Sequence, residues 1–181
     1  MGHGLRGVMQ SDASQISQRL EDLNVLIVDD ELGMRKVTRA LLQTIGVKNI
    51  YEANNGSRGL EMICTLAPDL VILDWEMPRP NGPEFMRAVR SLGKFPFPDV
   101  PVIMLTGHSE RSRVVEAVDL GVNEYLLKPV SSIALLARIT SILKKPRRMV
   151  KKGDYYGPEP RKLSSYKPES DDGRDQIFLI N

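Results

Sequence analysis

Polar residues that could do chemistry stand directly after short apolar runs at four places in the chain. These places are Asp29-Asp30-Glu31, Asp74-Trp75-Glu76, Thr106-Gly107 and Lys128-Pro129. Carboxylates held close together repel one another unless a cation neutralises them. Oxygen ligands that leave coordination positions for water suit Mg²⁺ better than zinc or copper. If these places meet in the fold, Asp29, Asp30 and Asp74 predict a magnesium site.

The hydroxyl of Thr106 and the ammonium of Lys128 would extend such a site toward phosphate. A metal, a hydroxyl and a lysine together can neutralise the equatorial oxygens of a phosphoryl group during transfer. One carboxylate would then act as the nucleophile and form an acyl phosphate. Asp74 is the candidate, because the Pro- and Gly-containing loop after it should leave its outer side accessible. The sequence therefore predicts a phosphate-accepting aspartate.

The apolar runs themselves predict buried strands. The strongest cover residues 25–28, 70–73 and 102–105, and weaker ones cover 49–53 and 124–127. Segments with helical spacing lie between them, near residues 34–45, 57–66, 82–92, 109–120 and 131–143. Gly46 stands where a helix C-terminus is expected, and Ser109 and Ser131 are candidate N-caps.

Five strands that alternate with five helices require a parallel sheet, since each crossover helix returns the chain to the same edge. The pattern predicts an α/β fold with a doubly wound, flavodoxin-like five-stranded sheet of order 2-1-3-4-5. That fold binds ligands beyond the carboxyl ends of its strands. All four polar places lie at such ends, so we expect them to converge.

The ordered set of residues resembles the receiver domain of two-component response regulators. It comprises Asp29-Asp30, Asp74-Trp75-Glu76-Met77-Pro78 with Gly82, Thr106, and Lys128-Pro129. Each dipeptide alone is weak, but the full set in order across five strand ends is specific. The resemblance covers residues 24–144, about two-thirds of the chain.

The resemblance implies a role for each position. Asp74 would be the phosphoacceptor, and Asp29, Asp30, Asp74 and the backbone carbonyl of Glu76 would bind Mg²⁺. Thr106 and Lys128 would contact the phosphoryl group, and Thr106 with Tyr125 would form the switch. The Lys128–Pro129 peptide bond is expected to be cis. The side chains of Glu76 and His108 are expected to tune the rate of dephosphorylation.

Composition limits the setting. A single cysteine, Cys64, excludes an internal disulfide framework, and its apolar surroundings predict a buried thiol. No apolar stretch reaches the roughly 18 residues of a membrane span, and no signal peptide is recognisable. We therefore expect a cytoplasmic protein with no membrane partner. Residues 1–22 are expected to be a partly disordered extension and residues 23–145 the receiver domain.

Residues 146–181 differ from the rest. Residues 144–181 carry 10 Lys and Arg against 6 Asp and Glu, whereas residues 1–143 carry 15 against 17. A basic run, Lys144–Lys152, precedes a Pro- and Gly-containing tail whose composition predicts no independent folding. The run is typical of a solvated helix end, and a nucleic acid or an acidic protein surface is an alternative partner. No helix-turn-helix fits.

We expect a signalling module rather than an enzyme in the usual sense, one that catalyses only its own Mg²⁺-dependent phosphotransfer and dephosphorylation. Its expected partners are a histidine kinase or phosphotransfer protein, and a downstream protein at the helix 4–strand 5–helix 5 face. Homodimerisation through that face is an open alternative to a monomer. A regulator whose basic tail binds nucleic acid is the second hypothesis. A haloacid-dehalogenase-type phosphatase fits poorly, because Glu76 stands where those enzymes have a second Asp.

Overall fold

A five-stranded parallel sheet forms the centre of the computed structural model, which describes residues 4–107 and 111–160. Its strands are β1 (Asn24–Val28), β2 (Asn49–Ala53), β3 (Leu70–Asp74), β4 (Val102–Thr106) and β5 (Glu124–Leu127). The order is β2-β1-β3-β4-β5, and each neighbouring pair is parallel. The predicted fold class and strand order are therefore confirmed.

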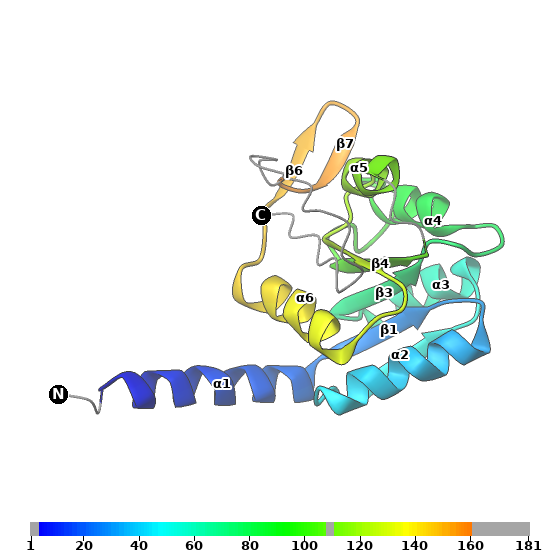
Figure 1. Ribbon diagram of the computed structural model, residues 1–181. Coiled ribbons are helices and arrows are strands. Elements are labelled where there is room, and N and C mark those ends of the chain that lie inside the picture. The colour runs from blue at the N-terminus through cyan, green and yellow to red at the C-terminus, as the bar shows by residue number, and fades with distance from the viewer. Residues whose placement is uncertain (1–3, 108–110, 161–181) are drawn as a thin grey trace.

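Helices cover both faces of the sheet (Figure 1). On one face α2 (Leu32–Thr44) and α6 (Ser132–Lys144) bury Leu42, Leu135 and Ile139 against Ile27 and Ile72. On the other face lie α3 (Gly56–Leu66), α4 (Gly82–Val89) and α5 (Arg111–Asp119). Their buried side chains pack against Leu26, Leu73 and Met104, and include Ile63, Phe85, Val89 and Ala117. Strands buried on both faces read as continuous apolar runs, which explains why they were visible in the sequence.

Local capping fixes several helix ends, including the starts of α4 and α6 at the carboxyl edge of the sheet. The side chain of Ser131 accepts a hydrogen bond from the Ala134 N–H at 3.2 Å, as predicted for an N-cap. Asn81 and Glu84 form a capping box at the start of α4. Gly46 follows α2 with a φ of +100°, the left-handed conformation expected after a helix C-terminus. Ser109 lies outside the described residues.

The N-terminal extension, for which partial disorder was predicted, is described from Gly4 onward. Residues Gly4–Asp22 form a 19-residue helix, α1, most of which extends away from the sheet (Figure 1). Its C-terminal end is anchored, because Leu20 and the following Leu23 are buried in the core on the side of α2 and α6. Ile16, Leu20 and Leu23 follow the i, i+4, i+7 spacing of one helix face. This pattern could have predicted the helix, although the segment is polar overall.

Part of the segment after α6, residues 149–158, forms regular structure, whereas its composition predicted only that the tail would not fold independently. Strands β6 (Met149–Lys152) and β7 (Tyr155–Pro158) pair as an antiparallel hairpin. Gly157 and Gly121 meet so closely that a Cβ on Gly157 would lie 2.6 Å from Gly121 Cα. The Arg147 guanidinium donates to the backbone oxygen of Asn123, just before β5. The hairpin thus packs on the body of the protein through Gly121 and Asn123, and this contact does not bear on whether the tail could fold independently.

Cys64 was predicted to be buried, and this is wrong, because its thiol is exposed. Helix α3 turns Gly59 and Ile63 toward the sheet, and Cys64 lies one residue beyond that buried face. Among the described residues, no helix combines the length and apolar character needed to cross a bilayer.

Candidate functional site

Three carboxylates converge at the carboxyl edge of the sheet. Asp29 follows β1 and is 2% exposed, and Asp74 ends β3 and is 3% exposed. Asp30 is exposed beside them. Each of the three residues offers one carboxylate oxygen within 4.8 Å of the others. They meet because β1 and β3 are adjacent parallel strands, paired from Val25 with Leu70 to Val28 with Leu73.

Lys128 supplies the positive charge that faces this cluster. Its Nζ lies 2.8 Å from Asp74 Oδ1 and 3.5 Å from Asp29 Oδ2. Burial alone would lower the pKa of Lys128, but its contacts with Asp74 and Asp29 outweigh burial and raise that pKa. Burial raises the pKa of the Asp74 carboxyl, and Lys128 opposes this shift only in part. Lys128 therefore offsets the effect of burial on Asp74 only in part.

The donor set fits a hard divalent cation. Asp74 Oδ1 is a buried oxygen with no aligned hydrogen-bond donor in the described part of the chain, its contact with Lys128 being an ion pair. Asp30 leaves the cluster open to solvent, so water could complete the coordination. Carboxylate oxygens with room for water are what Mg²⁺ prefers. Asp29, Asp30 and Asp74 are therefore able to hold Mg²⁺.

Thr106 and Tyr125 lie on adjacent strands beside the cluster. Thr106 ends β4 and is 0% exposed, and Tyr125 of β5 is 4% exposed. Burial raises the pKa of the Tyr125 phenol, while a hydrogen bond with the side chain of Thr106 opposes the shift. The predicted switch pair is thus in direct contact, with the tyrosine in a buried position.

The remaining predicted residues have different outcomes. The Lys128–Pro129 bond is cis, in agreement with the prediction, and Arg79–Pro80 is a second cis bond that the sequence did not indicate. The exposed side chain of Glu76 lies at the mouth of the site, where a Cβ on Gly107 would be 3.6 Å from its Oε2. His108 lies outside the described residues, so its predicted role remains a prediction.

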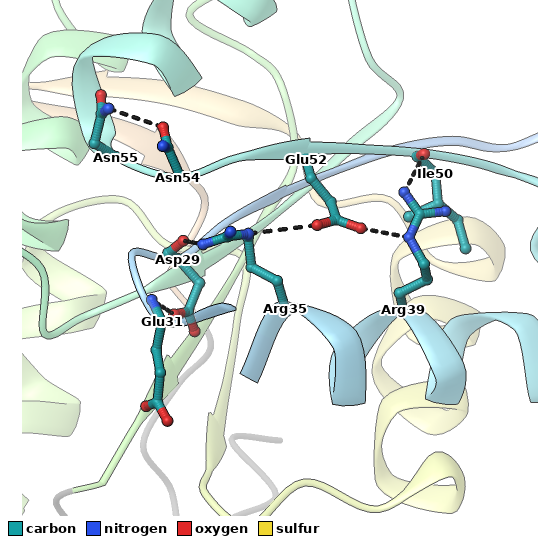
Figure 2. A network of polar contacts seen from close by, with 8 residues as sticks. All are labelled: Asp29, Glu31, Arg35, Arg39, Ile50, Glu52, Asn54 and Asn55. Atoms are coloured by element: carbon teal, nitrogen blue, oxygen red, sulfur yellow. Dashed lines mark hydrogen bonds and ion pairs between the residues drawn. The ribbon is translucent and has the colours of Figure 1, made fainter. Parts of the chain in front are cut away.

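Two residues near the site were not anticipated. The Arg35 guanidinium donates to the backbone oxygen of Asp29 at 2.8 Å (Figure 2). Arg113 of α5 lies with its guanidinium carbon 5.1 Å from the centre of the Trp75 ring, next to Asp74. An arginine on an amphipathic helix normally indicates a solvated side chain, so spacing alone could not have identified either one.

Comparison with known proteins now adds to this geometry. A family model described as the response regulator receiver domain matches residues 25–140. The chain belongs to this family. The matched range includes β1 from Val25 onward, the other four strands and the carboxylate cluster, so the site lies wholly within the matched module.

Several curated relatives share this module. The chemotaxis protein CheY of Pseudomonas aeruginosa is 34% identical over 123 residues, which is 68% of this chain and 98% of that protein. The KDP operon transcriptional regulatory protein KdpE of Escherichia coli is 39% identical over 122 residues, but the match covers only 52% of it. The solved structure of CheY4 from Vibrio cholerae superposes with a TM-score of 0.59 at 29% identity, covering 66% of this chain and 98% of that one.

Membership in this family makes the chain a phosphorylation-dependent signalling module. The comparisons do not favour the alternative of a regulator whose tail binds nucleic acid. Helix α1 and the whole β6–β7 hairpin lie outside the matched range. They are additions of this chain to the receiver module.

Proposed function

We propose that Asp74 accepts a phosphoryl group from a histidine kinase or phosphotransfer protein. The observation that carries this proposal is the buried Asp74 carboxylate, which shares a cluster with Asp29 and Asp30 and an ion pair with Lys128. An oxygen of Asp74 forms a bond to phosphorus while the bond between phosphorus and the donor histidine nitrogen breaks. The electron pair of the broken bond stays on that nitrogen. Mg²⁺ held by Asp29, Asp30 and Asp74 would supply positive charge to the phosphoryl oxygens.

The chain's own residues then hold the product. The Lys128 ammonium can move its ion pair from the carboxylate to a phosphoryl oxygen, since the carboxylate of Asp74 loses its negative charge when it is phosphorylated. The Thr106 hydroxyl, buried on the next strand, can donate to a second phosphoryl oxygen. Dephosphorylation is the attack of water on the same phosphorus, which breaks the bond from phosphorus to the Asp74 oxygen and releases inorganic phosphate. Glu76, which is exposed, and His108 are the proposed modulators of its rate.

The proposed output surface consists of α5, β5 and α6, which correspond to the predicted helix 4–strand 5–helix 5 face because α1 adds one helix. Tyr125 lies on β5 and contacts Thr106, so a movement of Thr106 toward phosphate would release it. Val115 of α5 is 46% exposed on this side, which suits contact with a partner protein. We propose a cytoplasmic location, with a downstream protein or a second copy of the chain as the partner.

The direct test compares phosphate uptake by Asp74→Asn with that of the wild type, using acetyl phosphate and Mg²⁺. Gels that retard phosphoproteins should show a shifted band for the wild type only. Asp154→Asn is the matched control, because Asp154 is exposed in the hairpin turn, away from the cluster. Uptake by Asp74→Asn at the wild-type level would contradict the proposal.

A further inference from the structure

Arg35 lies behind the acidic cluster and joins it to the edge strand of the sheet. It belongs to the first turns of α2, and its side chain is 11% exposed. Its Nη1 donates to the backbone oxygen of Asp29 at 2.8 Å, and its Nε lies 3.4 Å from Glu52 Oε2 on β2 (Figure 2). One guanidinium therefore contacts both the main chain of the cluster and the side chain of a neighbouring strand.

Glu52 is itself fixed, so Arg35 is held from behind. The second carboxylate oxygen of Glu52 accepts a hydrogen bond from Arg39 Nε. Arg39 also donates from Nη2 to the backbone oxygen of Ile50 at 2.9 Å. This Arg35–Glu52–Arg39 network connects α2 to β2 (Figure 2), and its end at Asp29 lies at the cluster. Long side chains that are held by contacts on both sides have little rotational freedom, so their hydrogen-bond donors occupy well-defined positions.

Arg35 provides one of four contacts that hold Asp29 in place. The Asp29 N–H donates to the backbone oxygen of Ala53 at 3.2 Å. The carboxylate of Asp29 accepts from the Glu31 N–H at 2.8 Å and pairs with Lys128 at 3.5 Å. Arg35 holds the carbonyl oxygen, which belongs to the peptide linking Asp29 to Asp30. The direction of this peptide sets where the Asp30 side chain leaves the backbone.

The orientation of the Asp29–Asp30 peptide affects the position of the Asp30 carboxylate more than that of the Asp29 carboxylate. Asp30 is exposed, whereas the buried Asp29 carboxylate has two partners of its own. Groups that orient metal ligands from behind commonly change metal affinity by about 10- to 100-fold when they are removed. The charge of Arg35 is paired with the carboxylate of Glu52. We therefore expect Arg35 to affect the metal site through the orientation of the Asp29–Asp30 peptide and not through its charge.

We propose that Arg35 is a positioning residue for the magnesium site, and that its Nη1 donor sets the orientation of the Asp29–Asp30 peptide and thereby of the Asp30 ligand. This inference rests on the proposed function, since it takes Asp30 as a ligand of Mg²⁺. A purely structural role in joining α2 to β2 would instead be shared equally by Arg35 and Arg39.

The test is Arg35→Gln, because a glutamine nitrogen can occupy the position of Nε beside Glu52 but cannot supply Nη1. Arg39→Gln is the matched control, since it likewise removes one Nη donor to a backbone carbonyl, that of Ile50. Magnesium binding is measured by calorimetry without any phosphoryl donor, and thermal unfolding is measured in the presence of a chelator. We expect Arg35→Gln to weaken Mg²⁺ binding by about tenfold, and Arg39→Gln by less than about twofold.

Arg35→Lys, which keeps a long donor, should recover most of the affinity. Unchanged affinity in Arg35→Gln, or an equal loss in both glutamine variants, would overturn the inference. Equal losses in unfolding temperature with unequal losses in affinity would support it, since stability and positioning are then separated. The result is distinct from a failure of the proposed function, which would appear as phosphate uptake by Asp74→Asn whatever the magnesium affinity of the arginine variants.

Discussion

At the scale of single residues, Asp74 holds a negative charge in a place where burial disfavours it. Its pKa is raised above 3.8, so between pH 3.8 and the raised value the folded protein binds more protons than the unfolded chain. By linkage, stability falls as pH rises through this window. Lys128, whose pKa is raised above 10.5, stays charged throughout and adds no slope there.

This argument predicts how wild type and Asp74→Asn differ with pH. In a chelator, the free energy of unfolding of the wild type should decline relative to that of Asp74→Asn as pH rises from 3.8 through the raised pKa of Asp74. Urea unfolding at a series of pH values measures the difference. A difference that stayed flat or grew with pH would show that the Asp74 carboxyl is not disfavoured by burial.

Lys128 predicts a second effect, because its ammonium competes with Mg²⁺ for the same carboxylates. Lys128→Ala should bind Mg²⁺ more tightly by about 1 kcal/mol, or about fivefold, since a repulsive charge is lost. The same variant should take up phosphate more slowly, since Lys128 no longer neutralises the phosphoryl oxygens. Calorimetry and acetyl phosphate kinetics measure the two effects, and weaker magnesium binding would contradict the assigned electrostatics.

At the scale of elements, the sequence was sufficient where apolar periodicity and strand ends carried the information. The five strands, their order and the convergence of Asp29, Asp74, Thr106 and Lys128 follow from buried runs that each end in a polar residue. Helix α1, the β6–β7 hairpin and the Arg35–Glu52 contact do not. Each depends on contacts with parts of the chain that are distant in sequence, so it cannot be predicted from local composition.

The hairpin gives a prediction with a matched control. Gly121 and Gly153 both have positive φ, +77° and +59°, so alanine costs each about 1 kcal/mol of backbone strain. A Cβ on Gly121 would also lie 2.7 Å from the backbone oxygen of Tyr156, whereas one on Gly153 would meet nothing within 4 Å. Gly121→Ala should therefore destabilise the protein more than Gly153→Ala, by about 1–3 kcal/mol.

Urea unfolding measures this difference, and hydrogen exchange shows where it acts. Amides of the hairpin should exchange faster in Gly121→Ala than in Gly153→Ala. Equal unfolding free energies for the two variants would mean that the hairpin does not pack on the turn before β5.

At the scale of the whole molecule, the proposed phosphorylation site lies at the carboxyl edge of the sheet, whereas the proposed partner surface is formed by α5, β5 and α6. Phosphorylation of Asp74 must therefore change the structure or dynamics of that surface. Beryllofluoride, which forms a stable phosphoryl mimic on carboxylates, should change hydrogen exchange chiefly in α5, β5 and α6. Amides of α3, on the other side of β3 from Tyr125, should change little. Asp74→Ala should show no response, and a response confined to α2 and α3 would place the output surface elsewhere. Light scattering on the same samples reports whether this surface joins two copies.

The central claim is that Asp74 is the residue that carries the phosphoryl group. Reduction of the acyl phosphate with borohydride converts the acceptor aspartate to homoserine, which peptide mass spectrometry can locate. After reaction with acetyl phosphate and Mg²⁺, homoserine should be found at position 74, and a chelator should abolish it. Conversion at Asp29 or Asp30 in place of Asp74, or labelling that persists without the metal, would contradict the account.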